Sequence, residues 1–304
     1  LLILNTCPGY SAPTRIAVVK SRNLDPYNTA LDSFKTIFKD KGYNIQFSYY
    51  DLEGKPEEAD FIFQDIKTYN PDLILTFGTE ATRAAKENIT DIPVVFSVVF
   101  NPVGNGFVQD SHYPANNLTG VALDVPVEVQ FKNLLLVLPG VRRLGAVYNP
   151  EKTGKVVEQA EEAAGKIDIE LIKVAVSSEK DVPAAIESLK GKIDALWAPV
   201  DNTVYNPFST KFILLFALRN KIPLMGFSEQ IVKAGAVMGI RGDYEIQGKK
   251  AANIAIEILK GKRISNIPVV LPDNPLLFLN RKAAQVIGIE LPAGALEKAK
   301  YIFE

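Results

Sequence analysis

PDLILTFGTEATR (71–83) and IDALWAPVDNTV (193–204) are the two stretches that decide the fold. In each, an aspartate leads into a short apolar run, and the run ends in polar residues that open a helical pattern. A second apolar run then follows, DIPVVFS (91–97) in the first case and KIPLMGFS (221–228) in the second. Since the same order of strand, helix and strand occurs twice in one chain, the sequence predicts two similar α/β lobes.

Short apolar runs alternate with longer amphipathic ones along most of the chain, which is typical of doubly wound parallel sheets with helices on both faces. The predicted strands are 15–20, 44–50, 73–77, 93–99, 143–148, 169–176, 193–200, 223–227 and 236–240. The predicted helices are 28–41, 57–69, 80–88, 152–164, 182–189, 209–219 and 244–260. The fold class is therefore α/β.

The composition is that of an ordinary globular protein, with 304 residues, 47% hydrophobic residues and a net charge of −1. Nucleic-acid-binding domains usually carry a basic excess, so we expect a small-molecule ligand and no nucleic acid. One cysteine and one histidine leave little for a zinc site, and a catalytic triad would have to use His112, which lies in a polar, loop-like run. We expect no metal, no cofactor and no catalysis.

The first residues, LLILNTC (1–7), resemble the end of a signal peptide. Leu4-Asn5-Thr6-Cys7 is similar to a bacterial lipobox, which predicts lipidation of Cys7. The alternative is cleavage nearer Ser11 or Ala12, which would leave no anchor. Both predict a periplasmic or cell-surface protein.

Polar and aromatic residues follow several predicted strands, and ligands of open α/β sheets bind outside the carboxyl ends of the strands. The candidates for ligand contact are Gly78, Thr79, Ser97, Asn101, Tyr148, Asp201, Asn202, Thr203 and Phe227. Tyr27, Phe100, Arg241 and Asp243 are candidates for a ligand or hinge role. Thr79, Asp201 and Thr203 have a second interpretation, because such residues also cap helices.

Five motifs, in order, resemble one known family: GTEATRAAKENITDIPVVFSVVFNPVGNGFV (78–108), NNLTGV (116–121), LPGVRRLGAVYNP (138–150), PVDNTV (199–204) and GDYEIQGKKAANIAIEILKGKRISNIPV (242–269). They are similar to the bacterial ABC-transporter substrate-binding proteins whose better-studied members bind aromatic amino acids. The resemblance runs from about Arg15 to about Leu291. It implies a type I periplasmic-binding-protein fold, in which two lobes joined by three crossovers close around a ligand.

The resemblance places the crossovers at 118–123, 241–244 and 269–275. The expected organisation is a signal-peptide remnant or linker (1–13), one lobe made of 14–120 plus 244–269, and a second made of 121–243 plus 270–304. Two departures concern the ligand. The chain has Asn101-Pro102 where the family usually has Asp-Pro, and Arg241 where a small residue is expected.

The resulting hypothesis is an extracytoplasmic, monomeric solute receptor that delivers a small polar ligand, such as an aromatic or apolar amino acid, to an ABC permease. The alternative is a ligand-sensing partner of a histidine kinase or chemoreceptor. Asp201 separates two interpretations of the site. Pairing with a ligand ammonium predicts that Asp201→Ala weakens binding by roughly 30-fold or more. A capping role predicts a loss of about 1 kcal/mol of stability instead.

Overall fold

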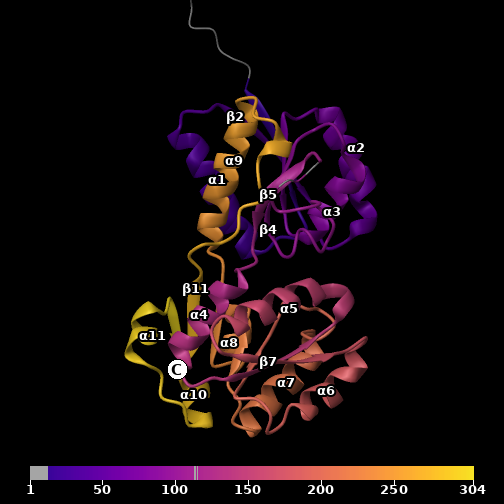
Figure 1. Ribbon diagram of the computed structural model, residues 1–304. Helices are drawn as coiled ribbons and strands as arrows, with labels where there is room; N and C mark the ends of the chain where they lie inside the picture. The colour runs from indigo at the N-terminus through magenta and orange to yellow at the C-terminus, as the bar shows by residue number, and fades with distance from the viewer. Residues whose placement is uncertain (1–12, 113, 115) are drawn as a thin grey trace, which may run out of the picture. The chain divides into compact units, whose positions relative to one another are not determined.

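The computed structural model describes residues 13–112, 114 and 116–304 (Figure 1). Its contacts divide the chain into two compact units. Unit 1 contains the described residues up to Ala122 together with Tyr244–Val270, and unit 2 contains Leu123–Asp243 together with Leu271–Glu304. The chain therefore passes from one unit to the other after Ala122, after Asp243 and after Val270.

Unit 1 is built on a five-stranded sheet in the order β2-β1-β3-β4-β5, in which every neighbouring pair is parallel. Its strands are β1 (Thr14–Lys20), β2 (Ile45–Asp51), β3 (Leu73–Phe77), β4 (Val94–Val99) and β5 (Leu118–Ala122). Its helices are α1 (Asp25–Asp40), α2 (Ala59–Tyr69), α3 (Thr79–Asn88) and α9 (Tyr244–Leu259), with 3-10 turns at Pro56–Glu58 and Ile264–Asn266.

Helices cover both faces of this sheet. Side chains alternate between the faces along each strand, so each strand has apolar side chains to pack against the helices on either face. Ala17 and Val19 of β1 pack in one cluster with Phe63 of α2 and Ala81 of α3. The opposite face receives α1 and α9, which lie side by side in Figure 1. The doubly wound arrangement predicted from the sequence is confirmed in this unit.

Unit 2 contains a seven-stranded sheet in the order β12-β11-β10-β9-β8-β6-β7. Its strands are β6 (Arg143–Tyr148), β7 (Glu170–Ala175), β8 (Ala195–Trp197), β9 (Leu224–Gly226), β10 (Met238–Arg241), β11 (Leu276–Asn280) and β12 (Tyr301–Phe303). Its helices are α4 (Val127–Val137), α5 (Pro150–Gly165), α6 (Val182–Ser188), α7 (Pro207–Arg219), α8 (Glu229–Lys233), α10 (Arg281–Ile287) and α11 (Ala293–Lys298), with a 3-10 turn at Glu179–Asp181. All pairs are parallel except β10 with β11.

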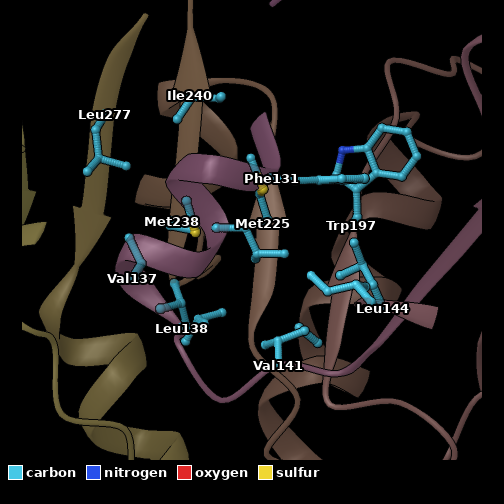
Figure 2. Packing of buried hydrophobic residues seen from close by; sticks show 14 of the residues in the cluster. Phe131, Val137, Leu138, Val141, Leu144, Trp197, Met225, Met238, Ile240 and Leu277 are labelled. Carbon is cyan, nitrogen blue, oxygen red and sulfur yellow. The ribbon is translucent and has the colours of Figure 1, made fainter. Parts of the chain in front are cut away.

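One hydrophobic cluster of unit 2 packs α4 against the middle of its sheet (Figure 2), and another is formed with residues of α6, α7 and α8. Phe131 of α4 packs edge-on against Trp197, with ring centroids 5.4 Å apart, and the indole N–H of Trp197 donates to Gln130 Oε1 at 2.7 Å. Trp197 was expected in the middle of a strand over 193–200, but β8 is shorter and Trp197 is its last residue. The strand therefore ends at Trp197, three residues before the predicted end at residue 200.

A glycine sets how closely α1 and α9 pack in unit 1. A Cβ atom at Gly248 of α9 would lie 1.9 Å from the carbonyl oxygen of Ala30 in α1. Backbone cannot yield as a flexible side chain can, so any larger residue forces the helices apart.

We expect Gly248→Ala to destabilise unit 1 by about 1–3 kcal/mol, the usual cost of overpacking. Gly154→Ala is the matched control, since a Cβ there meets nothing within 4 Å and alanine at this half-buried position inside α5 should stabilise the protein by about 0.5–1 kcal/mol. Thermal and urea unfolding of both variants measures the difference. A Gly248→Ala protein as stable as the parent would contradict the packing argument.

Candidate functional site

Ser21 ties together the carboxyl ends of β1 and β3 in unit 1. Its backbone N–H and its hydroxyl both donate to the carbonyl oxygen of Phe77, each at 3.0 Å. The same hydroxyl accepts the backbone N–H of Ala81 in the first turn of α3, also at 3.0 Å. One buried side chain therefore fixes where α3 starts relative to the strand before it.

Gly78 allows Tyr27 to approach this turn. The residue has φ of +87°, and a Cβ atom there would lie 2.3 Å from the Tyr27 hydroxyl and 2.7 Å from the Ser21 hydroxyl. Only glycine combines this conformation with this approach. Burial, with a smaller contribution from Glu80, raises the pKa of Tyr27 above its ordinary value, so the phenol is a neutral hydrogen-bond donor at physiological pH.

The N-terminus of α3 presents two backbone donors. Thr82 N donates to Gly78 O and Ala81 N to Ser21, whereas the N–H groups of Thr79 and Glu80 have no hydrogen-bond acceptor among the described residues. The capping interpretation of Thr79 is wrong, because Thr79 is the first helical residue and the cap position is Gly78, without a side-chain bond. Free N–H groups at a helix start attract anions, carboxylates included.

The end of β4 completes this edge with unusual backbone. Val98 has φ of +57° at a register shift between Phe96 and Val99, and a positive φ at a β-branched residue is a strained conformation. Ser97 is fully buried and its carbonyl oxygen accepts Gly78 N at 3.2 Å. Its hydroxyl has no partner among the described residues. Ser97 thus positions Gly78 through its backbone.

Asn101 holds the turn after β4. Its side-chain oxygen accepts the backbone N–H of Gly104 at 2.9 Å, and its φ is +45°. Asn105 donates from its side chain to the carbonyl oxygens of Phe100 and Asn101 at 3.0 and 3.1 Å. The half-buried Phe100 is placed by this turn.

Asp201 is the most connected candidate in unit 2, and only 1% of its surface is exposed. One carboxylate oxygen accepts the backbone N–H of Asn149 and the hydroxyl of Thr153, both at 2.7 Å. The other accepts the backbone N–H of Thr203 at 2.9 Å. Three donors from inside the unit compensate the buried charge, so the carboxylate is satisfied without a ligand.

The helix caps near Asp201 are supplied by two asparagines. Asn206 caps α7 by accepting the N–H groups of Phe208 and Ser209, each at 3.0 Å. The interpretation of Asp201 and Thr203 as caps of the following helix is therefore wrong. Asn149 caps α5, accepting Glu151 N at 2.9 Å, and its side-chain amide donates to the Thr203 hydroxyl at 3.2 Å.

Aromatic side chains lie beside this polar network. Tyr205 and Phe227 meet edge to face with centroids 5.8 Å apart, and Tyr148, at the end of β6, is half-buried. Burial, and secondarily the charge of Asp201, raises the pKa of Tyr205. Its hydroxyl has no partner among the described residues.

Arg241 is held within unit 2 at the end of β10. Its guanidinium lies 5.0 Å from the ring centroid of Phe278, pairs with Glu229 at 3.4 Å and donates to Gly242 O at 2.9 Å. Asp243, two residues further on, is half-buried.

The structure thus brings the candidates together in two groups, one at the carboxyl edge of each sheet. Tyr27, Gly78, Thr79 and Ser97 meet in unit 1. Asp201, Thr203 and Phe227 lie near Tyr205 in unit 2, where Asn202 is exposed. Sequence reasoning missed the roles of Ser21, Asn149 and Thr153. The dipeptide Asn149-Pro150 was a usable signal, since asparagine followed by proline is typical of a helix start. Cys7 lies outside the described residues.

Within 13–112, 114 and 116–304, no group of three or more histidine, cysteine, aspartate or glutamate side chains is placed to hold a metal ion. Over the same residues, no helix combines the length and the apolar character needed to cross a membrane.

We expect Asp201→Ala to lower the free energy of unfolding by about 3 kcal/mol or more, because buried donors of Asn149 and Thr153 lose a charged acceptor. Asp201→Asn should also destabilise, since an amide nitrogen cannot accept. Urea unfolding of the ligand-free protein measures both, and Asn202→Ala, at an exposed neighbouring position, is the control. Unchanged stability together with a large loss of ligand affinity would instead assign Asp201 to direct ligand contact.

Known proteins resemble this chain over nearly its whole length. A model of the family described as ABC transporter substrate binding protein matches residues 15–302. A tyrosine-binding protein of Clostridioides difficile (strain R20291) is 29% identical over 267 residues, which cover 86% of this chain and 77% of that protein.

Solved structures show the same fold. A ligand-free, open substrate binding protein with adhesive properties from Clostridium difficile has a TM-score of 0.79 at 26% identity, covering 95% of this chain and 99% of that one. A domain from Streptococcus pneumonia in complex with L-Trp has a TM-score of 0.73 at 22% identity, covering 96% and 100%.

Proposed function

Because this chain belongs to the family of ABC transporter substrate binding proteins, whose members bind a solute and do not transform it, we propose that it is the extracytoplasmic solute-binding component of an ABC importer. The proposed ligand is an aromatic or apolar amino acid. Two observations support it: the 29% identical relative is named for tyrosine binding, and each unit gathers its polar residues at the carboxyl edge of its sheet.

The carboxylate of the ligand is assigned to the N-terminus of α3. The N–H groups of Thr79 and Glu80 and the neutral phenol of Tyr27 are donors of the kind that bind a carboxylate. Ser21 and Gly78 keep these donors in place, since the first holds the start of the helix and the second admits Tyr27. This group of donors at the start of α3 is the main observation in support of the proposal.

The remaining groups of the ligand are assigned to unit 2. Phe227 and Tyr148 are half-buried aromatic side chains suited to an apolar or aromatic group. The ammonium requires an acceptor, and Asn202 and Asp243 follow strand ends of this unit without the full burial of Asp201. Contacts from both units would favour a closed form that the permease recognises.

Thr79→Pro tests the carboxylate site. Proline is tolerated at the first helical position, so it removes one backbone donor and leaves α3 intact. We expect L-tyrosine to bind about 10-fold to 100-fold more weakly, the equivalent of one charge-assisted hydrogen bond. Isothermal titration calorimetry measures the change.

Thr79→Ala is the matched control, because it keeps the N–H group and should bind L-tyrosine nearly as well as the parent. Tyramine, which lacks the carboxylate, should bind the parent and Thr79→Pro equally poorly. If Thr79→Pro bound L-tyrosine like Thr79→Ala, the carboxylate would not lie at this helix. If neither L-tyrosine nor L-tryptophan bound the parent, the proposed ligand class would be wrong.

Phe227→Ala tests the assignment of the apolar group. We expect it to weaken L-tyrosine and L-tryptophan by about 10-fold or more, as for loss of a buried aromatic contact, and to affect L-alanine much less. The ratio of affinities from calorimetry reports the effect. An equal loss for all three amino acids would mean that Phe227 supports the site without contacting the side chain.

The transport role is tested in cells. Deletion of the gene should abolish high-affinity uptake of radiolabelled ligand, and complementation with the Thr79→Ala form should restore it. Binding in vitro with unchanged uptake would favour the sensing alternative. Lipidation of Cys7 and a monomeric state stay predictions of the sequence, and release of Cys7→Ala protein from membranes would establish the first.

A further inference from the structure

The outer edge of the unit 1 sheet differs from the other sheet edges. β2 is an edge strand of seven residues, Ile45–Asp51, with no proline and no charged residue before Asp51. Proteins usually protect such edges with charges, short strands or covering elements.

The other edges show that protection. β7 carries Glu170 and Lys173, and Lys173 pairs with Glu161. β12 has three residues, and β5 is buried along its whole length. β2 alone among the edge strands of the described residues combines length with an uncharged sequence.

The backbone of β2 points alternately toward β1 and away from the sheet. Leu52 N donates to Lys20 O and Thr14 N donates to Asn44 O, so the even-numbered residues face β1. The period of two along a strand then directs the N–H and C=O groups of Phe47 and Tyr49 outward. These groups have no hydrogen-bond partner among the described residues, so they can pair with another strand.

A groove of about 610 Å³ borders this edge, formed by α1, the following turn and β2. The lining residues used below are Lys35, Phe38, Lys39, Tyr43, Phe47 and Tyr49. Phe38 and Tyr43 meet edge to face at 5.4 Å, and Phe47 and Tyr49 stack at 6.1 Å. Tyr49 is 54% exposed, so the groove offers an aromatic floor next to open backbone.

The charge of the groove is positive. The Lys35 ammonium lies 4.7 Å from the ring centroid of Tyr49 and 5.7 Å from that of Phe47. Neither Lys35 nor Lys39 forms an ion pair with any described residue, although Asp32 and Asp40 are on the same helix. Self-association by antiparallel pairing of two β2 strands would bring the lysines of both copies together, which disfavours a second copy as the occupant.

We propose that the edge of β2 and the adjoining groove bind an extended acidic segment of another protein by strand addition. Main-chain hydrogen bonds to Phe47 and Tyr49 supply affinity, as in other cases of strand addition. On the face of the added strand that covers the groove, an aromatic side chain packs on the aromatic floor. Carboxylates two residues before and after it on the same face pair with Lys35 and Lys39. This site uses none of the residues assigned to the amino acid ligand.

The test uses the full chain, isotope-labelled, and the synthetic peptide acetyl-Thr-Glu-Thr-Tyr-Thr-Glu-Thr-amide, whose tyrosine and two glutamates share one face of an extended strand. Binding should slow hydrogen exchange at the amides of Phe47 and Tyr49 in NMR spectra, whereas those of Gln46 and Ser48, already bonded to β1, should change little. A peptide with lysine at every glutamate position should not bind. Tyr49→Pro, which removes an outward N–H at a position where an edge strand tolerates proline, should abolish binding.

Lys35→Glu should weaken the acidic peptide by about threefold to fivefold, the range of one exposed ion pair, and the control Lys67→Glu, on α2, should not. A melting temperature close to that of the parent shows that each variant is folded. Three outcomes would overturn the proposal: no slowing at Phe47 and Tyr49, equal binding of the lysine peptide, or the same protection without peptide in a concentration-dependent dimer detected by sedimentation.

Discussion

The carboxyl edge of the unit 2 sheet depends on one buried carboxylate. β8 has three residues, and its ladder to β6 includes only two paired positions. The chain leaving such a short strand needs another restraint, and Asp201 provides it by binding the start of α5 at Asn149 and Thr153. A charge-assisted bond is shorter and stronger than a neutral one, so a side chain replaces strand length as the source of rigidity.

In unit 1 the chain at the ends of the strands is restrained by a neutral hydroxyl instead of a carboxylate. Ser21 connects the end of β1 to the end of β3 and to the first turn of α3 through a single hydroxyl. Its β1 pairs with β2 at seven positions and with β3 at five, so less has to be held by side chains there. The two units therefore share an architecture but not a chemistry at the edge: neutral donors gather in the first, and a satisfied charge supports aromatic side chains in the second.

Local signals explain how much of this could be predicted from the sequence. β3 and β6 were predicted with their observed bounds, because each is a compact apolar run followed by a polar turn. β11, β12 and the helices around them were not predicted, since Leu276–Asn280 and Tyr301–Phe303 are short runs without a repeating pattern. The aspartate at position 201, directly after a buried strand, indicated a polar site. Its hydrogen-bond partners could not be predicted, because Asn149 and Thr153 lie 52 and 48 residues earlier in the chain. The left-handed backbone at Val98 has no sequence signal, since valine is unfavourable there.

The close packing of α9 on α1 has a consequence for biosynthesis. Unit 1 is interrupted in the sequence, so the face of α1 that receives Gly248 stays bare until all of Leu123–Asp243 has emerged from the ribosome. Unit 2 in turn lacks β11 and β12 until the last residues are made. Unit 1 can complete its core only when Val270 has been made, and unit 2 only when the end of the sequence has been made. Both cores therefore close late in synthesis, and most of the elongating chain stays without a finished core.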